Sequence, residues 1–246
     1  MGGEGEISTY YAVVLVLASL VYSGYYLYRS TTHDGDPESA YSSSFWGGLR
    51  VEVTKALYVC LAYGLLVTTD DISLSWFGLV PVDGWGLVVA STGAVGAVIA
   101  ILLVQFVAQT AGISDPDWLE TALGIVYPTT SREWLGAVFI REPASALRIE
   151  LVFRGGCLTA LVVLTGLADI WFVVPVALMS ATLSLSLGGR LTLAHFARDV
   201  VTGLVYVLSG SLVAAILAHW GGNVLGTVAS HSKIAEKLPL LEPIDT

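Results

Sequence analysis

The chain has 246 residues, of which 55% are hydrophobic and only 13% are charged, and its mean hydropathy is +0.76. Ordinary globular domains carry about 25% charged residues, so this composition indicates a membrane protein. The net charge of -9, from 20 acidic against 11 basic residues, argues against the basic surface that nucleic-acid binders carry. We therefore expect a lipid bilayer around the chain and no nucleic acid among its partners.

The apolar runs account for the whole chain as one bundle of membrane-spanning helices. The first run, from Ile7 to Arg29, has tyrosines at its ends, is too long for a signal peptide and lacks a basic start. Six further spans are expected at Ala56 to Thr68, Trp85 to Val107, Leu147 to Leu167, Ile170 to Leu187, Leu191 to Leu208 and Ser211 to Val228. The prediction is an all-α, polytopic transmembrane helix bundle of about seven or eight spans, forming a single integral membrane domain over residues 1–246.

The stretch between Ala108 and Ala146 is mixed in character and leaves the number of spans open. Residues 115–127 fit a short amphipathic helix, and residues 130–140 fit a second helix that Thr130 or Ser131 would cap. Either helix can lie along the interface or form an eighth span. Pro143 is expected to mark the start of the next span, since proline favours the first turn of a helix.

Lysine and arginine orient the bundle, because cytoplasmic loops collect them. Basic residues flank the first connection, are missing from residues 56–131, and then return at Arg132, Arg141, Arg148, Arg190, Lys233 and Lys237. With an odd number of spans, this pattern places the N-terminus outside and the C-terminus inside. We expect a multi-pass protein of the cell membrane with a cytoplasmic C-terminus.

Few ionisable residues fall within the predicted spans, and those few are expected at one depth. Glu150 and Arg154 are on the fourth span, His195 is on the sixth, and His219 is on the seventh together with Asn223. Ionisable groups inside a membrane cost a few kcal/mol or more unless a partner faces them, so they mark candidate functional residues. In the predicted topology all five lie in the cytoplasmic half of the bundle, where we expect one polar pocket.

Each of these residues also has a structural interpretation. The glutamate and arginine, four residues apart, form a favourable ion pair within one helix, and His195 can be satisfied by a backbone carbonyl. The last histidine and asparagine can hydrogen-bond across helices. Arg198 and Asp199, which follow His195, are interpreted as interfacial or structural. The coincidence of three polar sites at one depth is what favours a functional site.

Three segments resemble the motifs of the CPBP intramembrane proteases, the CAAX-processing and bacteriocin-processing family. They are "ELVFRGG", "LTLAHF" and a Gly/Ser-punctuated hairpin that leads to "HWGGN". The family pattern is Glu-Glu-x-x-x-Arg, then Phe-x-x-x-His, then His-x-x-x-Asn, and residues 147–230 form the core that carries these motifs. The resemblance implies that four residues are catalytic, with Arg154 supporting them: Glu150, His195, His219 and Asn223.

The resemblance implies an endopeptidase that hydrolyses a peptide bond near the cytoplasmic membrane face. A carboxylate and an imidazole would activate water, and His219 and Asn223 would hydrogen-bond the oxyanion of the tetrahedral intermediate. The substrate would be a membrane-associated protein or peptide. Glu150, His195 and His219 also offer N and O ligands for a catalytic zinc without the HExxH spacing, so the pattern leaves both metal-free and metalloprotease-like chemistry open.

Two positions depart from the family pattern. Leu191 replaces the phenylalanine of the second motif, which keeps an apolar residue there. Ile149 replaces the first glutamate of the first motif, and isoleucine cannot take a proton. Either Glu150 does this work, which requires a turn of roughly 100° about the helix axis or a distorted helix, or the base is lost. Glu142 is a poor substitute, because it lies two helical turns from Ile149.

Two other functions fit the same residues. A catalytically inactive family member would bind or scaffold membrane partners, and a small transporter would use the polar cluster as its relay. A transporter usually shows repeat symmetry or broken helices in matching halves, and the sequence contains no visible internal repeat. The protease therefore ranks first, the inactive member second and the transporter third.

The predicted topology places residues 190 and 233 on the same side of the membrane. Single cysteines from Arg190→Cys and Lys233→Cys, in a chain with Cys60→Ala and Cys157→Ala, should react with an impermeant maleimide from the cytoplasmic side only. Labelling of right-side-out and inverted vesicles measures this. Reaction of the two positions from opposite sides would overturn the shared depth of the polar residues.

Overall fold

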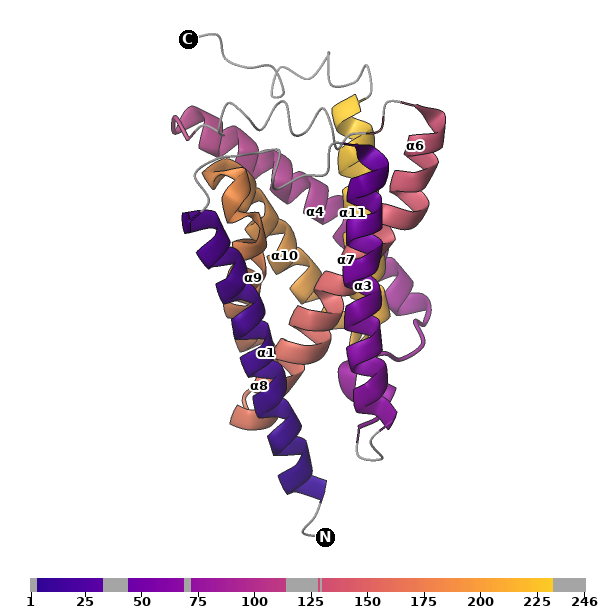
Figure 1. The fold of residues 1–246 in the computed structure, drawn as a ribbon, viewed down its shortest axis with the longest axis vertical. Helices are drawn as coiled ribbons and strands as arrows, with labels where there is room; N and C mark the ends of the chain where they lie inside the picture. Colours follow the sequence, from indigo (N-terminus) through magenta and orange to yellow (C-terminus); the bar gives the residue numbers. More distant parts are fainter. Residues whose placement is uncertain (1–3, 33–43, 69–71, 114–127, 129, 232–246) are drawn as a thin grey trace.

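The computed structural model describes residues 4–32, 44–68, 72–113, 128 and 130–231. Within these ranges the chain is an all-α bundle, as predicted, in which seven long helical segments run alternately up and down (Figure 1). The main helices are α1 (Glu4–Thr32), α3 (Phe45–Thr68), α4 (Gly84–Thr110), α6 (Ser131–Gly136), α7 (Glu142–Glu150), α8 (Thr159–Thr165), α9 (Val173–Ala181), α10 (Gly189–Ser209) and α11 (Leu212–His231). Helix α1 begins at the lower end of Figure 1, and α11 ends at the upper end.

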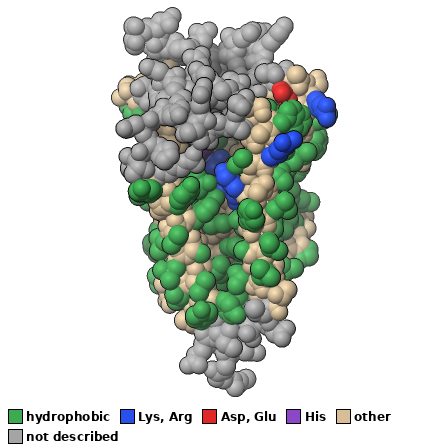
Figure 2. Space-filling model, viewed as in Figure 1, with side chains coloured by type: hydrophobic (Ala, Val, Ile, Leu, Met, Phe, Trp, Pro, Cys, Tyr) green, Lys and Arg blue, Asp and Glu red, His purple; other side chains and the backbone are tan. Residues whose placement is uncertain are grey.

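The helices have the apolar surface that a lipid bilayer requires. In the described part of the chain, five segments are long and apolar enough to cross a membrane: Thr9–Tyr28, Phe45–Thr68, Gly84–Thr110, Asp169–Leu187 and Gly189–Ser209. A shorter apolar helix, Leu212–Val228, follows them. On the described part of the face in Figure 2, hydrophobic side chains cover the lower part and the visible Lys and Arg side chains gather in the upper part. The chain is therefore a membrane protein.

The second span is longer than the sequence indicated. Helix α3 begins at Phe45 rather than at Ala56, so its first turns carry charged residues into the bundle. The Glu52 carboxylate forms ion pairs with Lys55 Nζ at 2.8 Å and with Arg148 Nη2 at 2.9 Å. An unpaired carboxylate within a membrane span is costly in free energy, and these two partners allow the charged turn to be part of the span.

The prediction that Pro143 starts a separate span is wrong. The chain is helical without a break from Ser131 to Thr165, through α6, α7 and α8 and two π-helical stretches. Thr130 caps the start of this segment in a capping box with Glu133, as the sequence indicated. A π-helix, η2 (Ala137–Arg141), ends two residues before the proline, and such bulges adjust the backbone around residues that break the regular ladder. The helix expected from Asp115 lies outside the described residues.

A second π-helix, η3 (Leu151–Leu158), distorts this segment next to Glu150. Tyr63 on α3 donates its hydroxyl to the Leu151 carbonyl oxygen at 2.7 Å, which satisfies an acceptor at the start of this stretch. The glycine pair within η3 makes room for its neighbours: a Cβ on Gly156 would lie 2.1 Å from Tyr63 Oη, and one on Gly155 would lie 2.8 Å from Leu212 Cδ2. The glycines of "RGG" therefore allow α3 and α11 to approach this part of the helix closely.

Small residues bring α4 against α10 and α11. A Cβ on Gly93 would lie 2.2 Å from Val205 Cγ2, and a Cβ on Gly222 would lie 3.2 Å from the Ala97 Cβ. Membrane helices gain little from hydrophobicity against each other, so close backbone approach and dispersion contacts dominate their packing. The two helices that carry the histidines are thus held against one common partner.

We expect Gly93→Ala to destabilise the bundle by about 1–3 kcal/mol, because the added methyl group must displace Val205 in a packed contact. Gly96→Ala is the matched control on the same helix, since its Cβ would lie 3.6 Å from Val201 Cγ1, an ordinary contact. The control should be neutral or stabilising by up to about 1 kcal/mol. Unfolding of the purified protein in detergent measures both changes, and equal effects would contradict this packing.

Candidate active site

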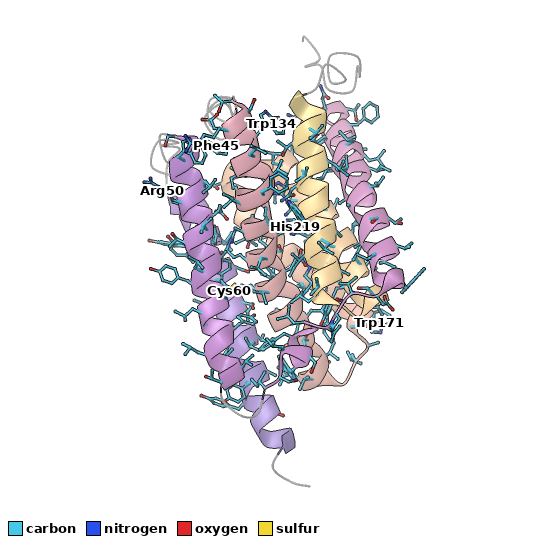
Figure 3. All side chains as sticks on the ribbon, turned by 90° about the vertical axis from the view of Figure 1, so that its right-hand side faces the viewer. Phe45, Arg50, Cys60, Trp134, Trp171 and His219 are labelled. Carbon is cyan, nitrogen blue, oxygen red and sulfur yellow. The ribbon has the colours of Figure 1, made fainter. Side chains whose placement is uncertain are left out.

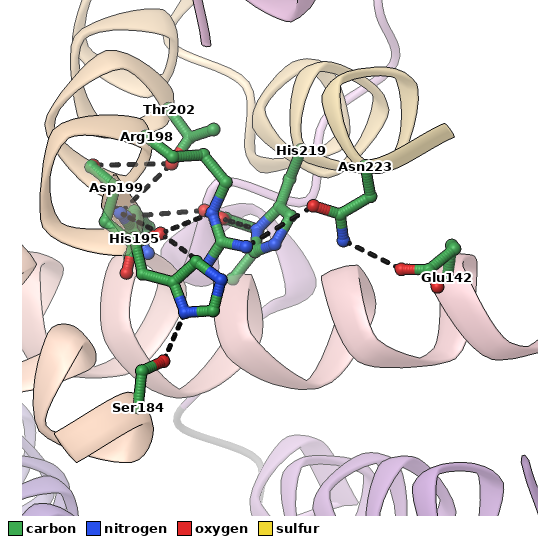
Figure 4. A network of polar contacts seen from close by, with 10 residues as sticks. Glu142, Ser184, His195, Arg198, Asp199, Thr202, His219 and Asn223 are labelled. Carbon is green, nitrogen blue, oxygen red and sulfur yellow. Dashed lines mark hydrogen bonds and ion pairs between the residues drawn. The ribbon is translucent and has the colours of Figure 1, made fainter. Parts of the chain in front are cut away.

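Residues from separate parts of the sequence meet in the interior of the bundle. Glu150 ends α7, Arg154 lies in η3, His195 lies on α10, and His219 and Asn223 lie on α11. Figure 3 shows His219 inside the bundle, and Figure 4 shows the polar contacts around it. The tertiary structure thus brings the predicted residues into one neighbourhood.

Glu150 and His219 form the central contact. Glu150 Oε1 lies 2.6 Å from His219 Nδ1, and both side chains are fully buried, with 0% exposed. An ionised carboxylate only accepts hydrogen bonds, so in this pairing the Nδ1–H group donates. The second ring nitrogen, Nε2, is buried and has no hydrogen-bond partner among the described residues.

Arg154 lies next to this pair and connects it to α10. Its Nε atom is 3.4 Å from Glu150 Oε2, the expected ion pair four residues apart on one helix. Its Nη2 group donates to the Asp199 carbonyl oxygen and, at 3.0 Å, to Thr202 Oγ1. Arg154 is 1% exposed, so this guanidinium group is fixed by the protein rather than by solvent.

One interpretation of the sequence placed Arg198 and Asp199 at the membrane interface. The structure buries both residues instead. They are 7% and 0% exposed, and both Nε and Nη2 of Arg198 contact Asp199 Oδ1, at 3.0 and 2.9 Å. Asp199 Oδ1 also lies 4.0 Å from Arg154 Nη2. Two guanidinium groups therefore flank one buried carboxylate, which explains how α10 can carry charge into the bundle.

Asn223 links this charged group to the upper part of α7. Its Oδ1 atom accepts from Arg198 Nη1 at 3.3 Å, and its Nδ2 group donates to Glu142 Oε2 at 3.0 Å. Arg141 in turn donates to Glu142 Oε1 from Nε at 2.9 Å and from Nη2 at 2.7 Å. Glu142 thus belongs to the network, although its distance along the helix from Ile149 had argued against a role.

His195 lies at the side of the network rather than in its centre. Its Nδ1 atom is hydrogen-bonded to the Ser184 hydroxyl, on the 3-10 turn that follows α9. Figure 4 places its ring close to that of His219, and the two rings are near enough to interact electrostatically. The imidazole of His195 is therefore positioned beside the Glu150–His219 pair without bonding to it.

Ile149 faces away from the polar residues. It is 7% exposed and packs in an apolar cluster with Phe153, Cys157, Val173 and Val176. Residues 149, 153 and 157 follow each other at intervals of four and share one helix face, whereas Glu150 and Arg154 share the neighbouring face. A carboxylate at position 149 would enter this apolar cluster, and the carboxylate at position 150 is the one that meets a histidine.

The charges of the network balance. Three guanidinium groups and three carboxylates are joined through short contacts, from Arg141, Arg154, Arg198, Glu142, Glu150 and Asp199. Buried charges are tolerated when opposite charges and hydrogen bonds surround them, and each costs several kcal/mol when it lacks such partners.

Sequence reasoning missed Ser184 and Thr202 altogether, because hydroxyl groups are common in apolar helices and give no pattern of their own. The positions of Arg198 and Asp199, three and four residues after His195, were the available signal.

The residues present do not form the zinc site that the resemblance left open. A catalytic zinc needs three protein ligands at about 2 Å with one open position. Among the described residues, no three His, Cys, Asp or Glu side chains come together in a way that could hold a metal ion.

One comparison with known proteins matches the segment that contains the network. Residues 131–225, which include every residue of the network, match the family model described as type II CAAX prenyl endopeptidase Rce1-like. No curated protein and no solved structure matches the chain. The matched segment is therefore similar to the membrane proteases of this family, and the match agrees with the resemblance that the three motifs indicated.

Removing the charge of Asp199 should destabilise the protein strongly, because Arg198 would lose the carboxylate that its Nε and Nη2 groups contact and the buried network would keep one uncompensated positive charge. We expect Asp199→Asn to lower the free energy of unfolding by about 3–5 kcal/mol. Asp169→Asn is the matched control, since that side chain accepts from the neighbouring Ile170 amide in an exposed turn, and its effect should stay within about 0.5 kcal/mol. Denaturation in detergent measures both, and a small loss for Asp199→Asn would contradict the network.

Proposed function

We propose that the chain is a CAAX-type intramembrane endopeptidase that hydrolyses a peptide bond near the cytoplasmic face of the cell membrane. The observation that carries this proposal is the fully buried Glu150–His219 pair, at 2.6 Å, inside the segment that matches the protease family. A structural ion pair needs no imidazole, since Arg154 already faces Glu150. The histidine adds a titratable group, which is what acid–base catalysis requires.

The polar cluster holds the groups that peptide hydrolysis needs. Water must lose a proton as it attacks the carbonyl carbon, and a carboxylate–imidazole pair accepts protons efficiently. The oxyanion that forms needs hydrogen-bond donors, and Asn223 has one N–H that is not used by Glu142. His195, only partly buried and beside the pair, is the second imidazole available to the substrate. We assign catalytic roles to Glu150, His195, His219 and Asn223, with Arg154 supporting them.

The substrate in this proposal is a membrane-associated protein or peptide. The family description names prenyl endopeptidases that act on CAAX sequences, so prenylated C-terminal peptides are the first substrates to test. The polar network extends through Glu142 to Arg141, towards the end of the bundle where α6 begins with Arg132, the end predicted to be cytoplasmic. A substrate held at that membrane face would reach the cluster from the interface.

The position of Ile149 favours one alternative. Because its side chain fills an apolar cluster, the site lacks the first carboxylate of the family motif, and a member without that carboxylate can serve as a binding or scaffold protein. In that case the network would stabilise the bundle alone. Substitutions in the Glu150–His219 pair would then change stability without changing any peptidase activity.

We expect Glu150→Gln to lower cleavage of the best substrate by about 10²- to 10⁴-fold, because the amide cannot supply the negative charge that supports proton transfer. The purified protein in detergent or nanodiscs would be tested on quenched-fluorescence peptides, prenylated and unprenylated, that end in a CAAX sequence. The variant changes few packing atoms, so the folded population is checked on the same sample by its thermal transition.

The matched control is Glu52→Gln. It makes the same chemical change in a carboxylate that pairs with Arg148 and Lys55, away from the Glu150–His219 pair. This variant should cleave at the wild-type rate. Wild-type protein that is folded but cleaves no peptide, or equal rates for wild type and Glu150→Gln, would refute the protease and favour the binding protein.

A further inference from the structure

The hydrogen bond between Glu150 and His219 determines which ring nitrogen can act. In a neutral imidazole one nitrogen carries a hydrogen and the other carries a lone pair. Glu150 is ion-paired with Arg154, and its Oε1 accepts from Nδ1 at 2.6 Å, which places the hydrogen on Nδ1. Nε2 is then an acceptor. An acceptor cannot donate a hydrogen bond to an oxyanion, which is the role that the motif implied for this histidine.

Nε2 is also the atom of this pair that remains available. It is fully buried and has no hydrogen-bond partner among the described residues. A buried polar atom of this kind is normally satisfied by an ordered water molecule or by a ligand. The charged groups that interact with the ring are Glu150, Arg198 and Asp199, Arg154 lies against Glu150, and the second imidazole is His195. His219 is thus surrounded by charges of both signs, and Nδ1 is fixed by one of the carboxylates.

We propose that His219 Nε2 is the general base of this site and that Glu150 is a positioning residue that fixes the Nδ1–H tautomer. The inference rests on the proposed function and reverses the roles within the motif. The missing carboxylate at position 149 is then not needed, because the carboxylate at position 150 acts through the imidazole. The arrangement is the carboxylate–histidine pair of other hydrolases, with water in place of a serine.

The step balances with water and peptide alone. The water oxygen forms a bond to the carbonyl carbon while one water proton moves to Nε2, which gives an imidazolium hydrogen-bonded to Glu150. When the carbon–nitrogen bond breaks, Nε2 returns that proton to the leaving nitrogen. The products are a carboxylic acid and an amine, and the neutral imidazole is restored. The donor to the oxyanion is the Asn223 N–H that Glu142 does not use.

The tautomer can be measured without any cleavage. The chain has four histidines, and ¹⁵N-histidine labelling with NMR in micelles distinguishes a protonated from an unprotonated ring nitrogen. The His219→Gln variant identifies the signals of His219 by their disappearance. We expect Nδ1 protonated and Nε2 unprotonated in the wild type, and a changed tautomer in Glu150→Gln, because the amide can donate to Nδ1. In Glu52→Gln the His219 signals should stay as in the wild type.

Kinetics provides the second readout. Glutamine at position 219 keeps an N–H donor but cannot act as the base, so His219→Gln should lower kcat by about 10²- to 10⁴-fold. Because Glu150 acts through His219, the double variant Glu150→Gln/His219→Gln should be no slower than His219→Gln alone.

Three outcomes are informative. The expected tautomer together with non-additive kinetic losses supports the inference. A hydrogen on Nε2 in the wild type, or a His219→Gln variant that stays active until Glu150→Gln is added, overturns it and makes Glu150 the base. A folded wild type that cleaves nothing but shows the expected tautomer refutes the proposed function, while the assignment of Nε2 as the acceptor stands.

Discussion

The structure depends on the pairing of a carboxylate with an imidazole in the interior of a membrane bundle. An isolated charge in that environment costs several kcal/mol, so Glu150 requires partners, and it finds Arg154 on its own helix and His219 on α11. Each partner requires further partners in turn. The result is a network that reaches from α10 to the upper turns of α7, and whose charges balance.

The geometry that permits this network is a distorted helix. Glu150 lies at the point where α7 becomes the π-helix η3, and Gly155 and Gly156 in that stretch let α3 and α11 approach. An ordinary helix with larger residues there would push α11 away, and His219 would lose its contact with Glu150. Distortions of this kind are frequent at functional sites, and they carry a cost that regular packing elsewhere must offset.

A second ion cluster lies on another face of α7. Arg148 donates to the Tyr22 hydroxyl on α1 and forms an ion pair with Glu52 on α3 at 2.9 Å. Since Arg148 is 6% exposed, these contacts fix the position of α7 between α1 and α3. Residues 148, 149 and 150 thus face an ion cluster, an apolar cluster and the candidate site in turn. This division explains why a polar residue is tolerated on either side of Ile149 but not in its place.

The sequence by itself determined the all-α membrane bundle, most of the span positions and the residues of the three motifs. Composition and the long continuous apolar runs are enough to identify the spans, because a membrane span requires little more than length and hydrophobicity. It also named Glu150, His219, Asn223 and Arg154 as neighbours, since few polar residues are available at that depth. Only the tertiary structure decided that Pro143 lies within a continuous helix, that α3 begins at Phe45, and that Arg198, Asp199 and Glu142 belong to the network. The physical reason is that the cost of a buried charge depends on partners distant in sequence, and sequence spacing within one helix does not show which partner another helix supplies.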